Sequence, residues 1–376
     1  MNRSDLPLLS ALVLALASCG AAPAGESAGQ AHASPVVNAS LAGFTITDHG
    51  RFDEPWAMAF IPGTPYALIT QRAGKLKLWQ DGANPREVAG VPKVDYGGQG
   101  GLGDVALSPH FAEDGTIYLS WAEAGPNDTR GAAVGRARLM LDGAPRLGPV
   151  EVIWRQDKVT GRGHYSHRLT FSPDGNTLYI ASGDRQMKTP AQDDRTNLGK
   201  IVRIALNGTE DAAPATETVS KGHRNVVGLR FDGEGRLWGL EHGPAGGDEL
   251  NFVRPGQNYG WPLVSNGDNY NGSAIPRHAT RADLAAPAIS WSPVIAPGDF
   301  IFYSGGLFPG WKGNAVIAGM GSDGLVRVAM DGERAREIER IPLGNRIREV
   351  RQGPDGAIWV LEDGEDARLR RIVPRK

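Results

Sequence analysis

The sequence predicts an all-β protein built as a single six-bladed β-propeller domain. The 51 glycines and 26 prolines are spread along the 376 residues rather than clustered, which indicates many turns between short strands. One sequence pattern recurs six times: an apolar strand, a turn with Pro, Asp or Gly, and a second strand. The copies are roughly 45–75 residues apart. Irregular spacing at that period is typical of propeller blades joined by unequal loops.

The six repeats account for the chain from about residue 41 onward. The first strands are predicted over residues 55–62, 103–109, 168–175, 227–232, 300–305 and 348–356, and the second strands over 67–70, 116–120, 177–181, 236–240, 315–318 and 357–361. A small sheet cannot bury both faces alone, whereas radial packing of six sheets buries them. A pair of β-sandwiches is the alternative architecture, and no long amphipathic helical pattern stands out.

Composition restricts the classes of function. Hydrophobic residues make up 40% of the chain and charged residues 22%, which allows a large buried core. The formal net charge is −2, so the chain has no basic excess for a phosphate backbone, and no nucleic acid partner is expected. The single cysteine excludes a disulfide within the chain.

The N-terminal region has the proportions of an export signal. Residues 8–17 form an apolar run that is too short to span a bilayer, and Leu-Ala-Ser-Cys follows, ending at Cys19. This tetrad resembles the bacterial lipobox, which implies cleavage before Cys19 and lipidation of its thiol. An ordinary secretory signal with an incidental cysteine is the alternative. We expect a signal peptide over 1–18, a flexible tether rich in Ala, Gly, Ser and Pro over 19–42, and the propeller over 43–376.

Residues 98–104 (GQGGLGD) form a glycine-rich stretch. Such a loop can cradle phosphate, but no Lys-Ser or Lys-Thr and no helix follows, so a P-loop is rejected. A tight turn between blades is the other interpretation.

A candidate general base follows in the third repeat. His164 lies on a loop just before a predicted strand, and Asp184 ends a neighbouring strand. A histidine oriented by a carboxylate is a general base near neutral pH. His167 is the alternative base, or simply a surface residue.

A third stretch is rich in oxygen ligands. It comprises residues 222–225 (GHRN), 241–251 (EHGPAGGDELN) and 255–262 (PGQNYGWP). Loops with acids and carbonyls suit a hard cation such as Ca²⁺. The absence of Cys ligands and of a His-x-x-x-His spacing disfavours zinc, and the spacing is not that of an EF-hand. Ordinary turn formation by Asn, Gly and Asp is the alternative.

The last stretch holds Arg346 and Arg348. Alternation along a strand places both on one face. Two adjacent guanidinium groups repel each other unless an anion lies between them, so they suggest a carboxylate or phosphate ligand. Pairing with Asp or Glu of a neighbouring blade is equally compatible.

Together these stretches resemble the soluble glucose and aldose sugar dehydrogenases that depend on pyrroloquinoline quinone (PQQ), which are grouped with the sorbosone dehydrogenases. The resemblance runs from about Phe52 to Ile372, and it is most specific in residues 222–225 and 242–262. It implies PQQ- and calcium-dependent oxidation of aldoses at the anomeric carbon to lactones. The base takes the proton of the anomeric hydroxyl while hydride passes to the quinone carbon, and Ca²⁺ polarises the quinone carbonyl.

The resemblance also implies roles for individual residues. His164 corresponds to the catalytic base and Asp184 to the carboxylate near it. The residues that correspond to PQQ contacts are Gln99, Arg224, Asn225, Arg346 and Arg348, with Asp248 beside the cofactor. The carbonyls of Gly243 and Pro244 correspond to ligands of the Ca²⁺ that also binds PQQ, whereas Glu249 and Tyr259 match a separate structural calcium site. The three carboxylates of PQQ would complement the charges of Arg224, Arg346 and Arg348.

The sequence departs from the family pattern at three places. Gly321 stands where the glucose dehydrogenases have a PQQ-contacting lysine, and Lys312 or another residue could substitute. An aromatic residue over the cofactor is replaced by Ser292, with Trp291 one position away. His167 replaces a small Gly and could narrow the substrate approach. These departures fit the aldose dehydrogenase branch better than the glucose-specific one.

Two other functions compete with the dehydrogenase. One is a calcium-dependent propeller lactonase, which has little use for an arginine pair. The other is a non-catalytic sugar-binding lipoprotein, against which the presence of His164, Asp184 and Arg224 argues. We expect an aldose substrate, an electron acceptor that is a quinone or cytochrome, and a lipid-anchored periplasmic location at the outer membrane.

Overall fold

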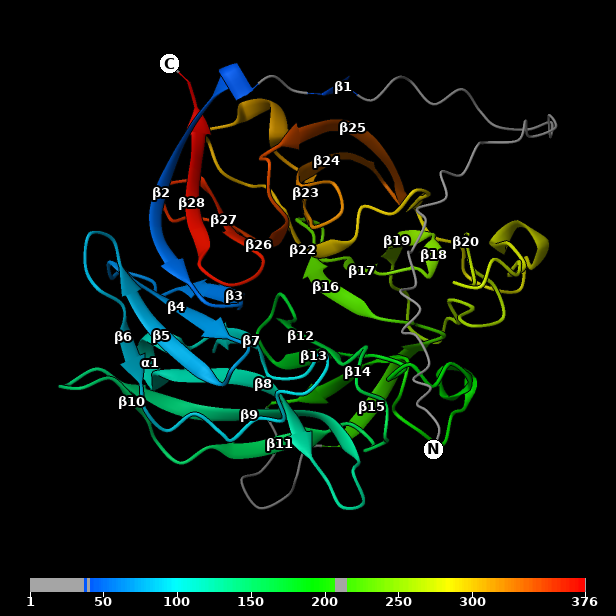
Figure 1. The fold of residues 1–376 in the computed structure, drawn as a ribbon, viewed down its shortest axis with the longest axis horizontal. Helices are drawn as coiled ribbons and strands as arrows, with labels where there is room; N and C mark the ends of the chain where they lie inside the picture. Colours follow the sequence, from blue (N-terminus) through cyan, green and yellow to red (C-terminus); the bar gives the residue numbers. More distant parts are fainter. Residues whose placement is uncertain (1–36, 39–40, 207–214, 376) are drawn as a thin grey trace, which may run out of the picture. The chain divides into compact units, whose positions relative to one another are not determined.

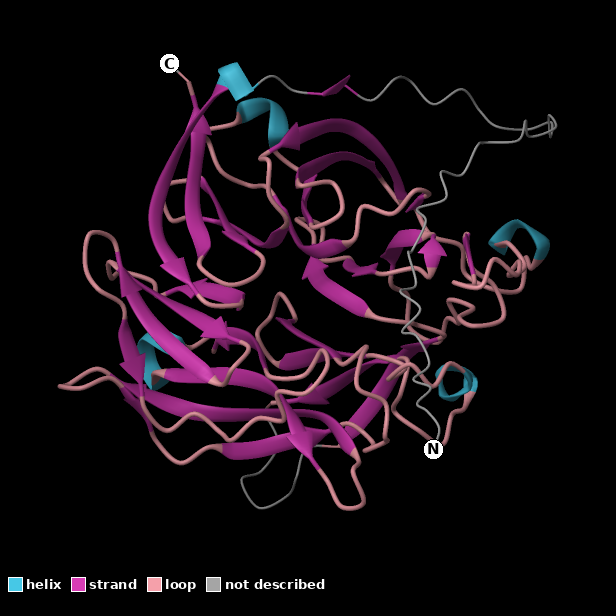
Figure 2. Ribbon diagram, viewed as in Figure 1, coloured by secondary structure: helices cyan, strands magenta, loops and turns pink. Residues whose placement is uncertain are grey.

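The computed structural model describes residues 37–38, 41–206 and 215–375. Within these residues nearly all regular structure is β-strand (Figure 2). The helices are single short turns: α1 (Phe111–Asp114), η1 (Leu41–Gly43), η2 (Thr189–Gln192), η3 (His278–Thr280) and η4 (Pro309–Trp311). None of the helices in the described ranges is long and apolar enough to cross a membrane. The predicted signal peptide, Cys19 and most of the predicted tether lie outside the described residues.

Six antiparallel sheets form the six predicted blades (Figure 1). Blades 1 to 3 consist of β3 (Pro55–Phe60), β4 (Tyr66–Gln71), β5 (Lys75–Gln80) and β6 (Arg86–Val88); β7 (Leu102–Leu107), β8 (Thr116–Ala124), β9 (Arg130–Met140), β10 (Arg146–Leu147) and β11 (Glu151–Arg155); and β12 (Ser166–Phe171), β13 (Thr177–Ser182), β14 (Lys200–Ala205) and β15 (Thr216–Lys221).

Blades 4 to 6 complete the ring. They consist of β16 (Val226–Phe231), β17 (Leu237–Glu241), β19 (Asp248–Phe252) and β21 (Ile289–Trp291); β22 (Pro297–Phe302), β23 (Ala315–Gly319), β24 (Gly324–Asp331) and β25 (Arg334–Pro342); and β26 (Ile347–Gln352), β27 (Ile358–Glu362), β28 (Ala367–Pro374) and β2 (Phe44–Phe52). A small ribbon of β18 (Ala245–Gly246) and β20 (Gly267–Asp268) lies beside blade 4. The two predicted strands of every repeat are the two innermost strands of one blade, so the six-bladed prediction is confirmed.

The ring is closed by pairing strands from the two ends of the described chain. β2 runs antiparallel to β28, with Phe44 opposite Pro374 and Phe52 opposite Ala367. In addition, β1 (Val37–Asn38), which falls in the predicted tether, pairs in parallel with β25. An unpaired edge strand offers free backbone groups to a neighbouring segment, which accounts for this addition.

Apolar side chains fill the spaces between adjacent blades. Each of six buried clusters joins one pair of neighbours, for example Leu68 and Trp56 of blade 1 against Leu102 and Trp121 of blade 2. The other five follow the same rule around the ring. Each blade therefore buries both faces, as the repeat argument requires.

The innermost strands carry a shared irregularity. All six have a register shift near their start, for example between Pro55 and Ala57 or between Ile347 and Glu349. A β-bulge re-aims the side chains around it. Trp56, His167 and Arg348 lie within such shifts, and all three line the same cavity at the centre of the ring.

Arg168 of blade 3 contacts residues of all five other blades. Its guanidinium is fully buried and lies 3.2 Å from Asp104 of blade 2, 3.2 Å from Glu349 of blade 6 and 3.7 Å from Asp299 of blade 5. Its Nε donates to the carbonyl oxygen of Val227 of blade 4 at 2.7 Å. The guanidinium also stacks 4.1 Å from the centroid of the Trp56 ring of blade 1.

Arg230 and Arg351 complete this buried network by pairing with Asp299, and Arg351 also pairs with Glu349 at 2.6 Å. Three arginines therefore balance three carboxylates. Buried charges are tolerated only when they are paired and hydrogen-bonded, so this network favours one arrangement of the six blades.

Candidate active site

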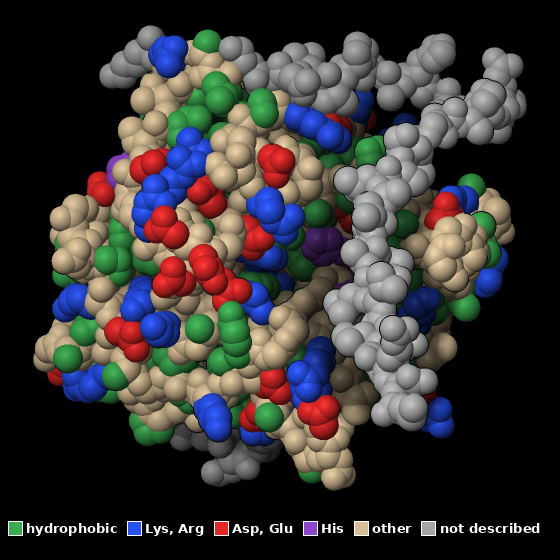
Figure 3. Space-filling model, in the orientation of Figure 1, with side chains coloured by type: hydrophobic (Ala, Val, Ile, Leu, Met, Phe, Trp, Pro, Cys, Tyr) green, Lys and Arg blue, Asp and Glu red, His purple; other side chains and the backbone are tan. Residues whose placement is uncertain are grey.

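Three cavities at the centre of the ring meet at Gln99. The histidine cavity, of about 550 Å³, is lined by His164, Asp184, Arg224 and Trp261. The arginine cavity, of about 290 Å³, is lined by Asn225, Arg346 and Arg348. The carbonyl cavity, of about 310 Å³, is lined by Gly243, Pro244 and Asp248. Figure 3 looks onto the face where a hollow containing histidine side chains opens.

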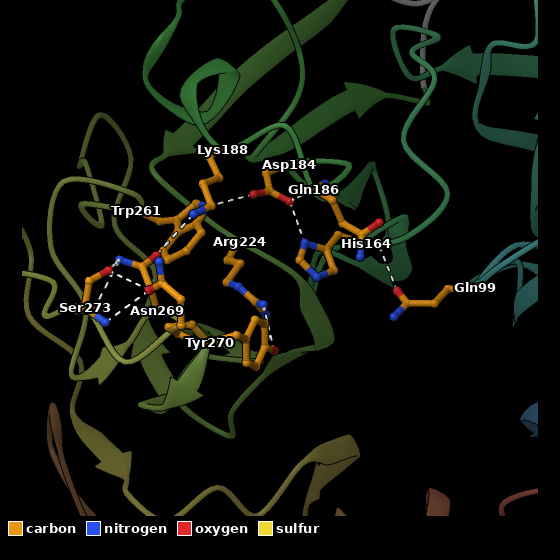
Figure 4. A pocket seen from close by; sticks show the side chains of 12 residues that line it. Gln99, His164, Asp184, Gln186, Lys188, Arg224, Trp261, Asn269, Tyr270 and Ser273 are labelled. Atoms are coloured by element: carbon orange, nitrogen blue, oxygen red, sulfur yellow. Dashed lines mark hydrogen bonds and ion pairs between the residues drawn. The ribbon is translucent and has the colours of Figure 1, made fainter. Parts of the chain in front are cut away.

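His164 and Asp184 form a buried pair. His164 Nδ1 lies 2.6 Å from Asp184 Oδ1, and the two residues are 8% and 0% exposed (Figure 4). The second carboxylate oxygen accepts a hydrogen bond from Trp261 Nε1 at 2.7 Å. The backbone N–H of Gln186 donates to Oδ1 at 2.8 Å. An ionised carboxylate only accepts hydrogen bonds, so the His164 proton resides on Nδ1 and the lone pair on Nε2. The geometry is that of a general base with its orienting carboxylate.

Glycines allow the two loops to approach closely enough for this pair. A Cβ added at Gly183 would lie 1.9 Å from the His164 carbonyl oxygen, and one added at Gly161 would lie 1.9 Å from the Arg185 carbonyl oxygen. Any larger residue would separate the loops. His164 itself has φ 47°, a left-handed conformation that is unfavourable for a residue with a side chain. Such strain persists where the surroundings fix it, often at functional sites.

The electrostatics keep this pair in the form of neutral imidazole and carboxylate. Burial lowers the pKa of His164, and the nearby Arg224 adds to this effect, while the hydrogen bond to Asp184 opposes it. Burial alone would raise the pKa of Asp184, but the hydrogen bonds from His164 and Trp261 outweigh it and hold that pKa below its usual range. His164 is therefore unprotonated, and able to accept a proton, at neutral pH.

His167, the alternative base, occupies a different environment. It is 3% exposed, so it is not a surface residue, and its Nδ1 lies 2.9 Å from the Ser120 hydroxyl. It lines the arginine cavity rather than the histidine cavity. Burial lowers its pKa to about 3. Because no carboxylate of the described part of the chain pairs with it, His167 lacks the orienting partner that His164 has.

Arg224 is a buried guanidinium with no carboxylate partner among the described residues. It is 6% exposed, and it donates to the His242 carbonyl oxygen at 3.2 Å and to the Tyr270 hydroxyl at 3.1 Å. Its Nε has no hydrogen-bond acceptor. A buried cation with an unused donor fits an anionic ligand that supplies the missing acceptor.

Arg346 and Arg348 share one carboxylate from their own blade. Arg346 Nε donates to one oxygen of Asp363 at 2.9 Å, and Arg348 Nη2 donates to the other at 2.7 Å. The predicted anion between them is therefore partly Asp363, which the sequence pattern did not indicate. Two cations still face one anion, so the cluster keeps a net positive charge at the wall of the arginine cavity.

Gln99 is fixed where the cavities meet. Its side-chain oxygen accepts a hydrogen bond from the backbone N–H of His164 at 2.8 Å, and the backbone N–H of Gln99 donates to the Arg162 carbonyl oxygen at 2.8 Å. The flanking glycines pack against other loops, since a Cβ at Gly101 would lie 2.2 Å from the Arg72 carbonyl oxygen. The glycine-rich stretch is thus a tight turn that presents Gln99. Asn225 lies across from it, and its side-chain oxygen accepts a hydrogen bond from the Ser166 hydroxyl at 3.2 Å.

The carbonyl cavity combines free backbone oxygens with a buried acid. No described residue donates a hydrogen bond to the carbonyl oxygens of Gly243 or Pro244. Asp248 is 0% exposed, accepts hydrogen bonds from the amides of Gly243 at 2.9 Å and Ala296 at 2.7 Å, and has a pKa raised by burial to about 6. Free carbonyls beside a carboxylate are the donor set that Ca²⁺ prefers, so these residues fit a calcium ion.

Glu249 and Tyr259 line a fourth, very small cavity of about 10 Å³ together with Glu241 and His278, and this cavity shares Gly243 and Pro244 with the carbonyl cavity. One amide group, Asn251 Nδ2, reaches both Glu241 at 2.9 Å and Glu249 at 3.4 Å. Burial and the charge of Glu241 raise the pKa of Glu249 well above its usual range. Two buried carboxylates this close fit a small cation, although no group of three His, Cys, Asp or Glu side chains in the described ranges converges as a metal site.

The positions that depart from the family pattern also have defined environments. Gly321 lies in a turn where its amide donates to Ile295 O at 2.8 Å, and Lys312 lines none of the three cavities. The Ser292 hydroxyl accepts from the Gly247 amide at 2.9 Å. Trp291 is buried between blades 4 and 5, where its indole donates to Glu337 at 2.6 Å. Trp291 therefore faces the core and does not cover the cavities.

Comparison with known proteins identifies the family of this chain. Residues 52–371 match the family model described as glucose/sorbosone dehydrogenase. The chain belongs to the glucose/sorbosone dehydrogenase family. It is 36% identical to the aldose sugar dehydrogenase YliI of Escherichia coli over 342 residues, which cover 86% of this chain and 91% of that protein.

The chain is also similar, at lower identity, to a protein whose name states that it is a quinoprotein. The quinoprotein glucose dehydrogenase B of Acinetobacter calcoaceticus is 24% identical over 403 residues, covering 83% of this chain and 84% of that one. The crystal structure of the soluble aldose sugar dehydrogenase of E. coli in its apo-form superposes with a TM-score of 0.81 and 34% identity, covering 88% of this chain and 100% of that chain.

All twelve residues predicted for the catalytic, cofactor and metal sites line these four cavities. The sequence pattern did not indicate Asp363, which pairs with Arg346 and Arg348, or Tyr270, which lines the histidine cavity, because neither lies in a local motif. It also assigned no role to Trp261, although it quoted the stretch that contains it. The signal that points to Trp261 in the sequence is its large aromatic side chain among turn-forming residues.

Proposed function

We propose that this protein oxidises aldoses at the anomeric carbon to lactones, with PQQ as its resident redox cofactor and Ca²⁺ beside it. The observation that carries the proposal is the junction at Gln99. There a buried His164–Asp184 pair lies next to guanidinium groups that have too few carboxylate partners. A propeller lactonase has no use for such an anion site, and a sugar-binding protein needs no strained base.

The residues present fit the cofactor. Arg224, Arg346 and Arg348 supply cationic donors for the three PQQ carboxylates, while Gln99 and Asn225 offer side-chain amides on the same walls. Gly243 and Pro244 would hold Ca²⁺ through their free carbonyl oxygens, with Asp248 nearby. The similarity to a quinoprotein glucose dehydrogenase supports this assignment. Glu249 and Tyr259 would hold a second, structural calcium ion.

His164 carries the acid–base part of the reaction. When bound, PQQ with its Ca²⁺ supplies the acceptor for the hydride that leaves C1 of the sugar. His164 Nε2 takes the proton of the anomeric hydroxyl, and this makes departure of the hydride easier. Asp184 fixes the tautomer and stabilises the imidazolium that forms, and Trp261 holds the other carboxylate oxygen in place. Depression of the His164 pKa keeps the base ready at neutral pH.

Glucose deuterated at C1 tests this chemistry. The protein reconstituted with PQQ and Ca²⁺ should convert it to a lactone or aldonate that has lost the deuterium, and the deuterium should slow the step that breaks the C1–H bond. An oxidised product that keeps the C1 deuterium would show that a different carbon reacts, and would refute oxidation at the anomeric position.

A further inference from the structure

Lys188 is a cation in the histidine cavity that neither the fold nor the proposed chemistry uses. Its ammonium group donates to Asn269 Oδ1 at 3.1 Å (Figure 4). Among the described residues, Lys188 has no ion pair within 4 Å. It lines the same cavity as His164, together with Asn271 and Ser273. The far side of the cavity from the base is therefore walled by a lysine and neutral hydrogen-bonding groups.

The charge in this cavity is not balanced by acids. Of the residues that the structure describes, Asp184 is the only carboxylate that lines it, and its oxygens already accept hydrogen bonds from His164, Trp261 and the backbone N–H of Gln186. Asp268, at the start of the Asn269–Ser273 loop, is paired with Arg277 at 2.8 Å. A ligand that extends from His164 toward Lys188 thus meets a positive end, where the ammonium group donates one hydrogen bond to Asn269 and keeps its other N–H groups for the ligand.

The backbone that presents Lys188 is strained. Arg185, Gln186 and Lys188 have φ of 56°, 62° and 62°, the left-handed region that glycine adopts without cost. Arg185 uses its side chain to support the base loop, donating to the Gly163 carbonyl oxygen at 2.9 Å. Gln186 and Lys188 instead direct their side chains to the cavity wall. Side chains kept at strained positions indicate a local role beyond turning the chain.

We propose that Lys188 is a specificity residue that selects aldoses bearing an anionic substituent, a carboxylate or phosphate, distal to the anomeric carbon. This rests on the proposed function, because the anomeric end must lie at His164 for the distal end to reach Lys188. The ammonium pairs with the anion through the N–H groups that it does not donate to Asn269. Uronic acids and aldose phosphates share this chemistry, and the experiment separates them.

The test compares neutral and anionic sugars on matched proteins. The reconstituted holoenzyme is assayed with glucose, glucuronic acid and glucose 6-phosphate, as wild type, Lys188→Gln, Lys188→Arg and the control Lys75→Gln. Lys75 is an exposed lysine of blade 1 that lines none of the three cavities. We expect at least one anionic sugar to have a KM about fivefold below that of glucose, the upper range for a solvent-exposed ion pair, because Lys188 is itself exposed.

In Lys188→Gln this advantage should disappear while kcat for glucose stays unchanged. Lys188→Arg and Lys75→Gln should keep it, and added salt should weaken it. Which of the two anionic sugars gains identifies the substituent. Equal ratios of anionic to neutral KM in wild type and Lys188→Gln would overturn the proposal. Oxidation of glucose without any preference for an anion refutes the role of Lys188 and leaves the dehydrogenase function intact.

A binding measurement covers the case in which no sugar is oxidised and the proposed function itself fails. Calorimetric titration of the protein with glucuronic acid and glucose 6-phosphate is then compared between wild type and Lys188→Gln. Binding weakened by the substitution supports the anion subsite. Binding that is absent, or unchanged by the substitution, refutes it.

Discussion

Replacement of Asp184 by asparagine tests the buried pair on which the acid–base chemistry depends. The carboxylate accepts three hydrogen bonds, from His164 Nδ1, Trp261 Nε1 and the Gln186 amide, and it is fully buried. An amide has one acceptor oxygen, and its NH₂ group meets a donor whichever way it is turned. At least one donor is left unpaired, and His164 loses the partner that fixes its tautomer.

The size of the effect follows from these contacts. A hydrogen bond to a charged group contributes about 1.5–3 kcal/mol, which corresponds to roughly 10- to 150-fold in rate. If the wrong tautomer places the proton on Nε2, the whole contribution of the base is lost, about 10²- to 10⁴-fold. We therefore expect kcat of Asp184→Asn to fall at least about tenfold, with near-normal PQQ binding.

The pH profile gives a second readout. His164 acts in its neutral form, so activity rises with pH through its pKa. Asp184 raises that pKa, while burial and Arg224 lower it. Removing the carboxylate should therefore move the acid limb of kcat/KM to lower pH. The assay is steady-state aldose oxidation by holoenzyme between pH 4 and 9. An unchanged rate, or an acid limb that moves to higher pH, would refute the assigned pair.

Three further substitutions examine other parts of the account. His164→Ala should retain PQQ and lose at least about a hundredfold in turnover; if it stays active while His167→Ala is inactive, the base is His167. Arg346→Glu places a second carboxylate beside Asp363 and should weaken PQQ binding at least about tenfold in a calorimetric titration; normal affinity there would exclude the assigned anion site. Arg168→Met leaves three buried carboxylates with two arginines and should lower the free energy of unfolding by about 3–5 kcal/mol in denaturant titrations; unchanged stability would show that the network does not hold the blades together.

The sequence was sufficient for the blade count because each repeat contains the two innermost strands of one blade. Those strands carry the strongest apolar pattern, since they are buried on both faces. The outermost strands are shorter or more exposed and give a weaker signal, as the intermediate and exposed residues of β2 show. Pairing of β2 with β28 joins segments more than 300 residues apart, which no local pattern encodes.

The candidate site was predictable where function depends on a local motif and not where it depends on packing. His164 and Asp184 lie just before and just after the two inner strands of blade 3, so the repeat itself brings them together. The suggestion that Trp291 covers the cofactor fails because a neighbouring position in a strand faces the opposite side. A β-bulge between Ile347 and Glu349 breaks the alternation from which we predicted that Arg346 and Arg348 share one face of a strand. Asp363, which accepts hydrogen bonds from both arginines, follows directly after β27, the neighbouring strand of the same blade.

The most direct test of the central claim is dye-linked oxidation of an aldose panel by the apoprotein, by the protein with PQQ and Ca²⁺, and by the protein with PQQ and a chelator. The account predicts activity only when both PQQ and Ca²⁺ are present. Equal activity in the apoprotein, or failure of the protein to bind PQQ at all, would contradict the assignment of the arginine and carbonyl cavities to this cofactor.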